Sequence, residues 1–77
     1  MHIVTDVKYL ADYRLKVSFN TGESKEVNLE SYLEGEMFEP LRDRKLFQKV
    51  QINPDVDTIC WENGADLAPE FLYEIGK

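Results

Sequence analysis

The fold class is decided by the stretch Tyr13-Arg14-Leu15-Lys16-Val17-Ser18-Phe19-Asn20-Thr21-Gly22. Apolar and polar side chains alternate from Tyr13 to Phe19, which is the period of a strand with one buried face. Asn20, Thr21 and Gly22 then fit a three-residue hairpin loop in which Gly22 adopts the left-handed conformation. A hairpin joins antiparallel strands, so an antiparallel sheet is the expected centre of the fold.

Strands are predicted on both sides of this hairpin. One face of an upstream strand over residues 3–10 carries Ile3, Thr5, Val7 and Tyr9. Ala11-Asp12 is the expected turn between this strand and the next one. Downstream of the hairpin, residues 23–29 are expected to form a third strand.

The second half of the chain mixes helix and strand signals. Residues 30–36 predict a short helical or irregular link, and Asp43 can cap a helix that begins at Arg44. Strand formers follow at residues 50–52 and 58–61.

Pro69 is placed for the first turn of a last helix. The element order is therefore β-β-β-α-β-β-α. We expect an α+β fold with a small antiparallel sheet of about five strands and short helices packed on one face. Seventy-seven residues hold a single domain, residues 1–77, because so short a chain cannot bury two full-sized cores.

The charge is strongly acidic and unevenly distributed. The formal net charge is −6; residues 26–41 carry five acids and no base, and residues 52–77 carry six acids against one lysine. Such a chain repels phosphate backbones and anionic membrane surfaces. We therefore expect no membrane and no nucleic acid as partner of the isolated chain. The expected partner is a small basic protein, and a homodimer is the alternative assembly.

The one basic segment is residues 42–51. Arg42, Lys45 and Lys49 fall at spacings of three and four, which predicts one helical stripe able to touch phosphate. The simpler interpretation is a solvated face that exchanges ion pairs with the flanking acids.

Several chemistries lack the residues they need. Cys60 and His2 are the only cysteine and histidine, so an intrachain disulfide, a structural zinc site and a histidine-activated nucleophile are excluded. The glycines are isolated, so no phosphate-binding loop is present. We expect no enzyme activity, cofactor or metal. No segment resembles a signal peptide, which favours a cytoplasmic location.

The densest run of chemically distinctive residues extends from Trp61 to Tyr73. Trp61 is expected in the core, Asn63-Gly64 in a turn, and Asp66 as a cap near the next helix. The functional interpretation makes this run a recognition surface. Its candidate binding residues are Trp61, Asn63, Asp66, Glu70, Tyr73 and Glu74.

Four segments together resemble a bacterial family catalogued as domain of unknown function 2442. They are Leu15-Lys16-Val17-Ser18-Phe19, Gly22, residues 38–47 and the closing run 61–73. Two residues depart from the family pattern: Glu62 stands where proline is common, and Asn28 where aspartate is frequent.

The resemblance implies a small α+β domain of the bacterial cytoplasm without enzyme activity. Members of the family are often encoded beside another small protein in a toxin-antitoxin-like arrangement. The leading hypothesis is thus an acidic protein–protein interaction module, the antitoxin-like partner of a small basic protein. The alternative is a small-ligand-binding or sensor domain with a shallow site near Trp61.

Overall fold

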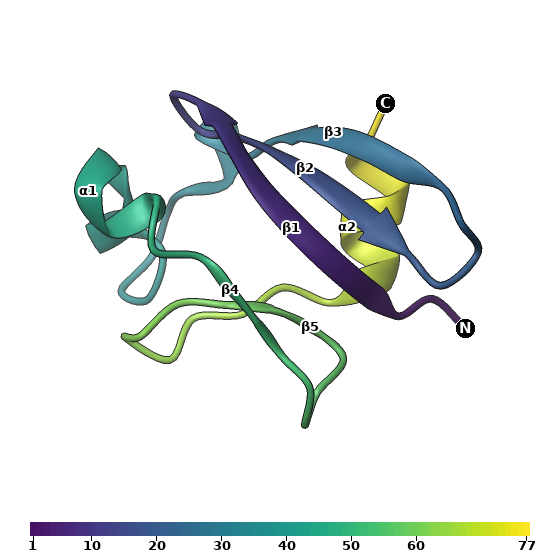
Figure 1. Ribbon diagram of the computed structural model, residues 1–77. Helices are drawn as coiled ribbons and strands as arrows, with labels where there is room; N and C mark the ends of the chain where they lie inside the picture. Colours follow the sequence, from purple (N-terminus) through teal and green to yellow (C-terminus); the bar gives the residue numbers. More distant parts are fainter.

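A computed structural model describes all residues 1–77 of the chain. Its first half is a three-stranded antiparallel sheet in the order β1-β2-β3, formed by β1 (Val4–Ala11), β2 (Arg14–Phe19) and β3 (Ser24–Asn28) (Figure 1). The hairpin loop contains Gly22 at φ +91°, the left-handed conformation that the sequence predicts. The turn between the first two strands is formed by Asp12, at φ +51°, and Tyr13, one residue later along the chain than the expected Ala11-Asp12.

The face assignment at the start of β1 differs from the expectation. Val4 is buried, whereas Thr5 is exposed and Ile3 is half-buried. The pairing of β1 with β2 shifts register between Val4 and Asp6, so Thr5 is the additional residue of a β-bulge. A bulge reverses the alternation of faces, which a pattern with a strict period of two cannot show.

The second half begins with two 3-10 turns, η1 (Glu30–Tyr32) and η2 (Glu39–Arg42), followed by the one-turn helix α1 (Arg44–Phe47). The Asp43 carboxylate accepts a hydrogen bond from the backbone N–H of Lys45 at 3.0 Å, so the expected cap is confirmed. The expected basic stripe does not lie on one helix, because α1 ends at Phe47 and Arg42 belongs to η2.

The remaining strands β4 (Gln51–Asn53) and β5 (Thr58–Cys60) form a separate two-stranded antiparallel sheet. The α+β class and the total of five strands are confirmed, but the strands are divided between two sheets. One backbone hydrogen bond, from Val4 N–H of β1 to the carbonyl of Asp57 in the β4–β5 turn, connects the two hairpins, and the second hairpin does not extend the first sheet.

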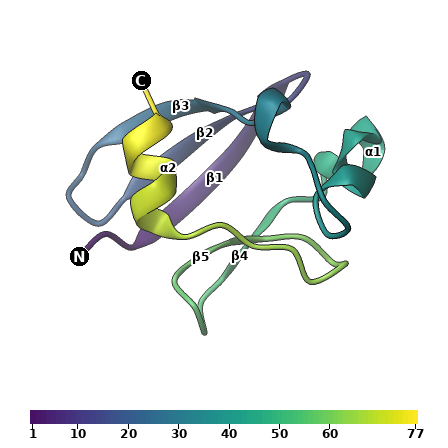
Figure 2. The same ribbon diagram turned by 180° about the vertical axis from the view of Figure 1, so that it is seen from behind.

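The last helix, α2 (Pro69–Ile75), lies across one face of the three-stranded sheet (Figure 2). Pro69 begins it, as predicted. Asp66 does not cap it: the N-cap is Ala68, without a side-chain hydrogen bond. Asp66 instead forms an isolated β-bridge with Cys60.

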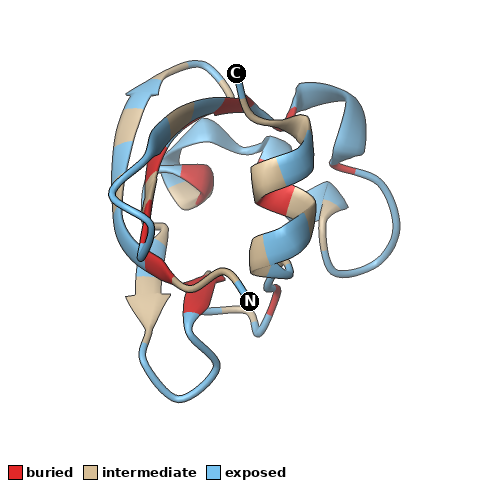
Figure 3. Cartoon of the chain, turned by 90° about the vertical axis from the view of Figure 1, so that its right-hand side faces the viewer, coloured by how far each residue is buried: buried red, intermediate tan, exposed pale blue.

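One hydrophobic cluster joins both sheets and the helices. Buried positions lie on the three-stranded sheet, on α2 and on other elements of the chain (Figure 3), and the cluster extends to Leu41 of η2 and Phe47 of α1. The cluster consists of Val4, Leu15, Val17, Phe19, Val27, Leu29, Leu33, Leu41, Phe47, Ile59, Trp61, Ala65 and Leu72. No helix of the structure combines the length and apolar character needed to span a bilayer.

Candidate functional site

Trp61, the first of the candidate binding residues, lies in the core. It is 2% exposed, its ring packs 5.7 Å from that of Phe47, and its indole N–H donates to the Phe47 carbonyl at 3.0 Å. A side chain so enclosed has no surface to offer a partner in this conformation. The structure therefore agrees with the interpretation of Trp61 as a core residue.

Asn63 connects the closing run to a distant loop. Its side-chain N–H donates to the Met37 carbonyl at 2.9 Å, while its side-chain oxygen accepts from the Ala65 N–H at 3.1 Å. The adjacent Gly64 has φ +92°, a conformation that glycine adopts without strain. Asn63 therefore holds its own turn and also fixes the position of Met37.

Met37 belongs to residues 30–39, which we call the acidic loop. The four carboxylates of the acidic loop are exposed and form no ion pair with a basic side chain. They belong to Glu30, Glu34, Glu36 and Glu39. Between them, Tyr32 is 43% exposed and Met37 is 44% exposed. The loop thus combines unpaired negative charge with two large apolar side chains at the surface.

The acids of the closing run do not form one uniform patch. Glu62 lies 3.7 Å from the Lys49 ammonium, and Glu70 pairs with His2 at 2.6 Å. Asp66 and Glu74 are exposed and form no ion pair. Two of these four carboxylates are therefore already engaged within the chain.

Tyr73 is the centre of a second group of side chains, which we call the Tyr73 cluster. Its members are His2, Phe19, Glu23, Lys25, Glu70 and Tyr73. The His2 ring stacks on the Tyr73 ring at a centroid distance of 3.8 Å, and the Lys25 ammonium lies 3.7 Å from the Tyr73 centroid. The cluster joins the N-terminal residues, the β2–β3 hairpin and α2.

Hydrogen bonds shift three pKa values in this cluster. The Tyr73 hydroxyl, as donor, lowers the pKa of Glu23, and the same bond raises the pKa of Tyr73. The pKa of Glu70 is lowered by its bond from the His2 backbone N–H and next by its bond to the His2 ring. The donors stabilise the ionised carboxylates of Glu23 and Glu70, and the Glu23 carboxylate as acceptor stabilises the protonated form of Tyr73.

One cavity of about 880 Å³ lies outside the Tyr73 cluster and adjoins the start of the acidic loop. It is a groove beside β3, bounded by η1 and by the end of α2, and we call it the β3 groove. Its lining residues are Glu26, Asn28, Glu30, Ser31, Tyr32, Arg42, Ile75 and Lys77. Trp61 does not line it. No group of three or more metal-ligating side chains is arranged to hold an ion.

A family model described as "Protein of unknown function (DUF2442)" matches residues 4–77. The chain belongs to this family. The DUF2442 match contains the whole acidic loop, the β3 groove and every member of the Tyr73 cluster except His2. Neither a comparison with curated proteins nor one with solved structures returned a significant match.

Sequence reasoning on this DUF2442 domain missed several surface residues. Tyr32 and Met37 stand within the run of acids without a base, but this position does not identify them as exposed, because Leu33 of the same run is buried. His2 and Glu23 gave no signal in the sequence, since they meet Tyr73 only through the tertiary fold.

Proposed function

We propose that this chain is a non-enzymatic protein–protein interaction module whose acidic loop binds a small basic protein. The observation that carries the proposal is the composition of the loop surface. Four exposed, unpaired glutamates surround Tyr32 and Met37, which are each exposed by more than two fifths. Large apolar side chains within a charged rim are typical of protein interfaces.

The two kinds of residue have different roles in this proposal. The carboxylates attract a basic partner over a distance and raise the association rate. Tyr32 and Met37 provide the contact area that is removed from water after docking, which governs the lifetime of the complex.

The acidic loop is held in place before binding. The Asn63 side chain bonds the Met37 carbonyl at 2.9 Å, and the Tyr32 ring packs edge-to-face on Phe71 at 5.1 Å. The Arg42 guanidinium Nε donates to the Leu33 carbonyl at 3.0 Å. Such contacts reduce the entropy lost when a loop binds, so more of the contact energy remains as affinity.

The resemblance to a family whose members are often encoded in a toxin-antitoxin-like arrangement suggests which protein to test first. The proposed partner is the small basic product of a neighbouring gene, and the chain acts on it in the bacterial cytoplasm as an antitoxin does, by occluding or stabilising it. No observation favours the alternative of a ligand site near Trp61, because this side chain is buried and does not line the groove.

The test is association kinetics with the partner obtained by affinity purification from the native cell. Glu36→Lys with Glu39→Lys should slow association by about tenfold at low salt, with a smaller effect at 0.5 M salt, where charges are screened over about 4 Å. Asp6→Lys with Asp55→Lys is the matched control, since it changes the net charge equally at exposed positions outside the loop.

The α2 pair Glu70→Lys with Glu74→Lys provides a second comparison. It should slow association without unfolding the domain, but by less than the loop pair, because Glu70 is already bonded to His2. Equal rates for the wild type, the loop variant and the control would exclude the acidic loop as the binding surface.

A further inference from the structure

The outer edge of β3 offers unpaired backbone groups. Leu29 N–H donates to the Tyr13 carbonyl at 2.9 Å, and Phe19 N–H donates to the Glu23 carbonyl at 2.8 Å. Odd-numbered residues of β3 therefore face β2, and the even-numbered residues direct their N–H and C=O groups away from it. β3 pairs with β2 alone, so this side is a sheet edge.

One position on that edge already holds an extended segment of the chain. Glu26 N–H donates to the Lys77 carbonyl, and Lys77 N–H donates to the Glu26 carbonyl, both at 3.0 Å. This reciprocal pair is the geometry of an added antiparallel strand. The outward backbone groups of Ser24 and Asn28, on either side, bond no backbone partner.

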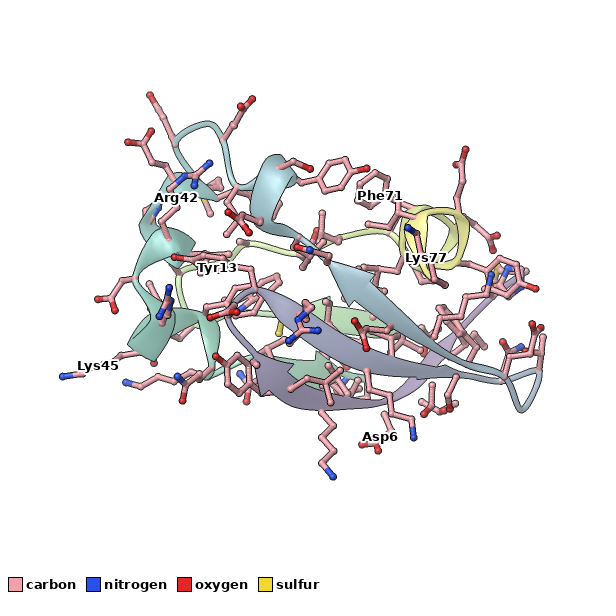
Figure 4. All side chains as sticks on the ribbon, turned by 90° about the horizontal axis from the view of Figure 1, so that it is seen from above. Asp6, Tyr13, Arg42, Lys45, Phe71 and Lys77 are labelled. Carbon is pink, nitrogen blue, oxygen red and sulfur yellow. The ribbon has the colours of Figure 1, made fainter.

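The β3 groove runs along the Asn28 side of this edge. Arg42 lies at one end of the region and Lys77 at the other, with η1 between them (Figure 4). The groove lining also includes Glu30, whose carboxylate has no ion pair, and Tyr32, which is exposed. A groove lined by an unpaired carboxylate and an aromatic ring suits a lysine or arginine side chain.

We propose that the β3 groove binds an extended segment of the partner that carries a lysine or arginine. The backbone of the segment bonds Asn28 in line with the Glu26–Lys77 pair, and its cationic side chain meets Glu30 and Tyr32. This inference rests on the proposed function and specifies the element that the partner contributes: one extended, basic strand added to the sheet edge.

The test is an NMR titration of the full chain with two capped five-residue peptides, one alternating lysine with valine and one alternating glutamate with valine. The lysine peptide should shift resonances of residues 24–32, and at saturation it should slow hydrogen exchange of the Asn28 amide by at least threefold. Glu30→Gln should weaken its binding about threefold, as expected for one exposed ion pair. Asp55→Asn, an equal charge change in the β4–β5 turn, should leave binding unchanged.

Other outcomes separate this inference from the proposed function. Equal binding of both peptides, or shifts without protection of the Asn28 amide, would overturn strand addition. Shifts confined to residues 34–39 would overturn the groove and leave the acidic loop standing as the binding surface. Absence of shifts at 24–32 at about 5 mM peptide would also overturn the groove, since a single weak strand site is saturable in the millimolar range.

Discussion

The Tyr73 hydroxyl donates to the Glu23 carboxylate, at 2.9 Å from Oε1 and 3.0 Å from Oε2, across 50 residues of sequence. This bond connects α2 to the loop between β2 and β3. It stabilises the ionised form of Glu23 and the protonated form of Tyr73, so its contribution to stability depends on pH at both ends of the scale.

Tyr73→Phe should lower stability at neutral pH and have less effect in acid and in alkali. The folded pKa of Glu23 is below its ordinary value of 4.5, so the stabilisation is present above that value and is lost as pH falls through the folded pKa. The folded pKa of Tyr73 is above 10.0, so the stabilisation is present below that value and is lost as pH rises through the folded pKa.

Urea unfolding of both proteins at pH 3, 7 and 11 measures this difference. Tyr32→Phe is the control, because the Tyr32 hydroxyl makes no hydrogen bond in the structure. A stability difference for Tyr73→Phe that is constant with pH would contradict the assignment.

His2→Ala should raise the pKa of Glu70 only part of the way to its ordinary value of 4.5. The larger cause of the lowered pKa is the backbone N–H of His2, which alanine retains, and the ring bond is the smaller cause. Carboxyl NMR titration of the Glu70 side chain measures the change. A full return to the ordinary pKa would show that the ring positions the backbone donor as well.

Trp61→Ala should cost about 3–5 kcal/mol, because the deletion leaves a large cavity in the core. Trp61→Phe should cost less, since it retains an aromatic ring and loses the hydrogen bond to the Phe47 carbonyl. Chemical unfolding followed by far-UV circular dichroism gives both values. Wild-type fluorescence should have the emission maximum of buried indole, and a water-exposed maximum would contradict the placement.

Gly76→Ala should destabilise the chain by about 1–3 kcal/mol through crowding. A Cβ at this position would lie 2.7 Å from the Lys25 Cβ and 3.0 Å from the Leu72 carbonyl oxygen, although φ −70° suits alanine. Hydrogen exchange of the Glu26 amide, which bonds Lys77, should accelerate. Gly35→Ala is the control, because a Cβ at this position meets no atom within 4 Å and adds only the backbone strain of φ +88°. Hydrogen exchange of the Glu26 amide should therefore not change in this variant.

The isolated chain should not bind duplex DNA specifically at about 150 mM salt, where electrostatic attraction extends only about 8 Å. Arg42 and Lys49 are engaged with the Leu33 carbonyl and the Glu62 carboxylate, and they do not share a helix with Lys45. Fluorescence anisotropy with a labelled duplex tests this. Binding at micromolar concentration would restore the basic segment as a candidate site.

Local patterns in the sequence were sufficient to predict most of the strands, turns and helix starts. The alternation of Leu15, Val17 and Phe19 predicts β2, Gly22 predicts the hairpin, and Asp43 and Pro69 predict helix starts. These features depend on residues a few positions apart, where side-chain period, backbone conformation and capping act directly. The closing run likewise identifies the family before any contact is known.

Only the tertiary structure decided which residues meet. The bulge at Thr5, the division of the strands into two sheets, and the bond between Tyr73 and Glu23 arise from contacts between distant segments. The same is true of Asn63 and Met37, which bring the closing run to the acidic loop. Packing of the shared core sets these distances, and a one-residue change of register would move every side chain to the other face of its strand. The sequence therefore determines the elements and the charge of the surface, whereas packing determines which charged and apolar side chains become one binding surface.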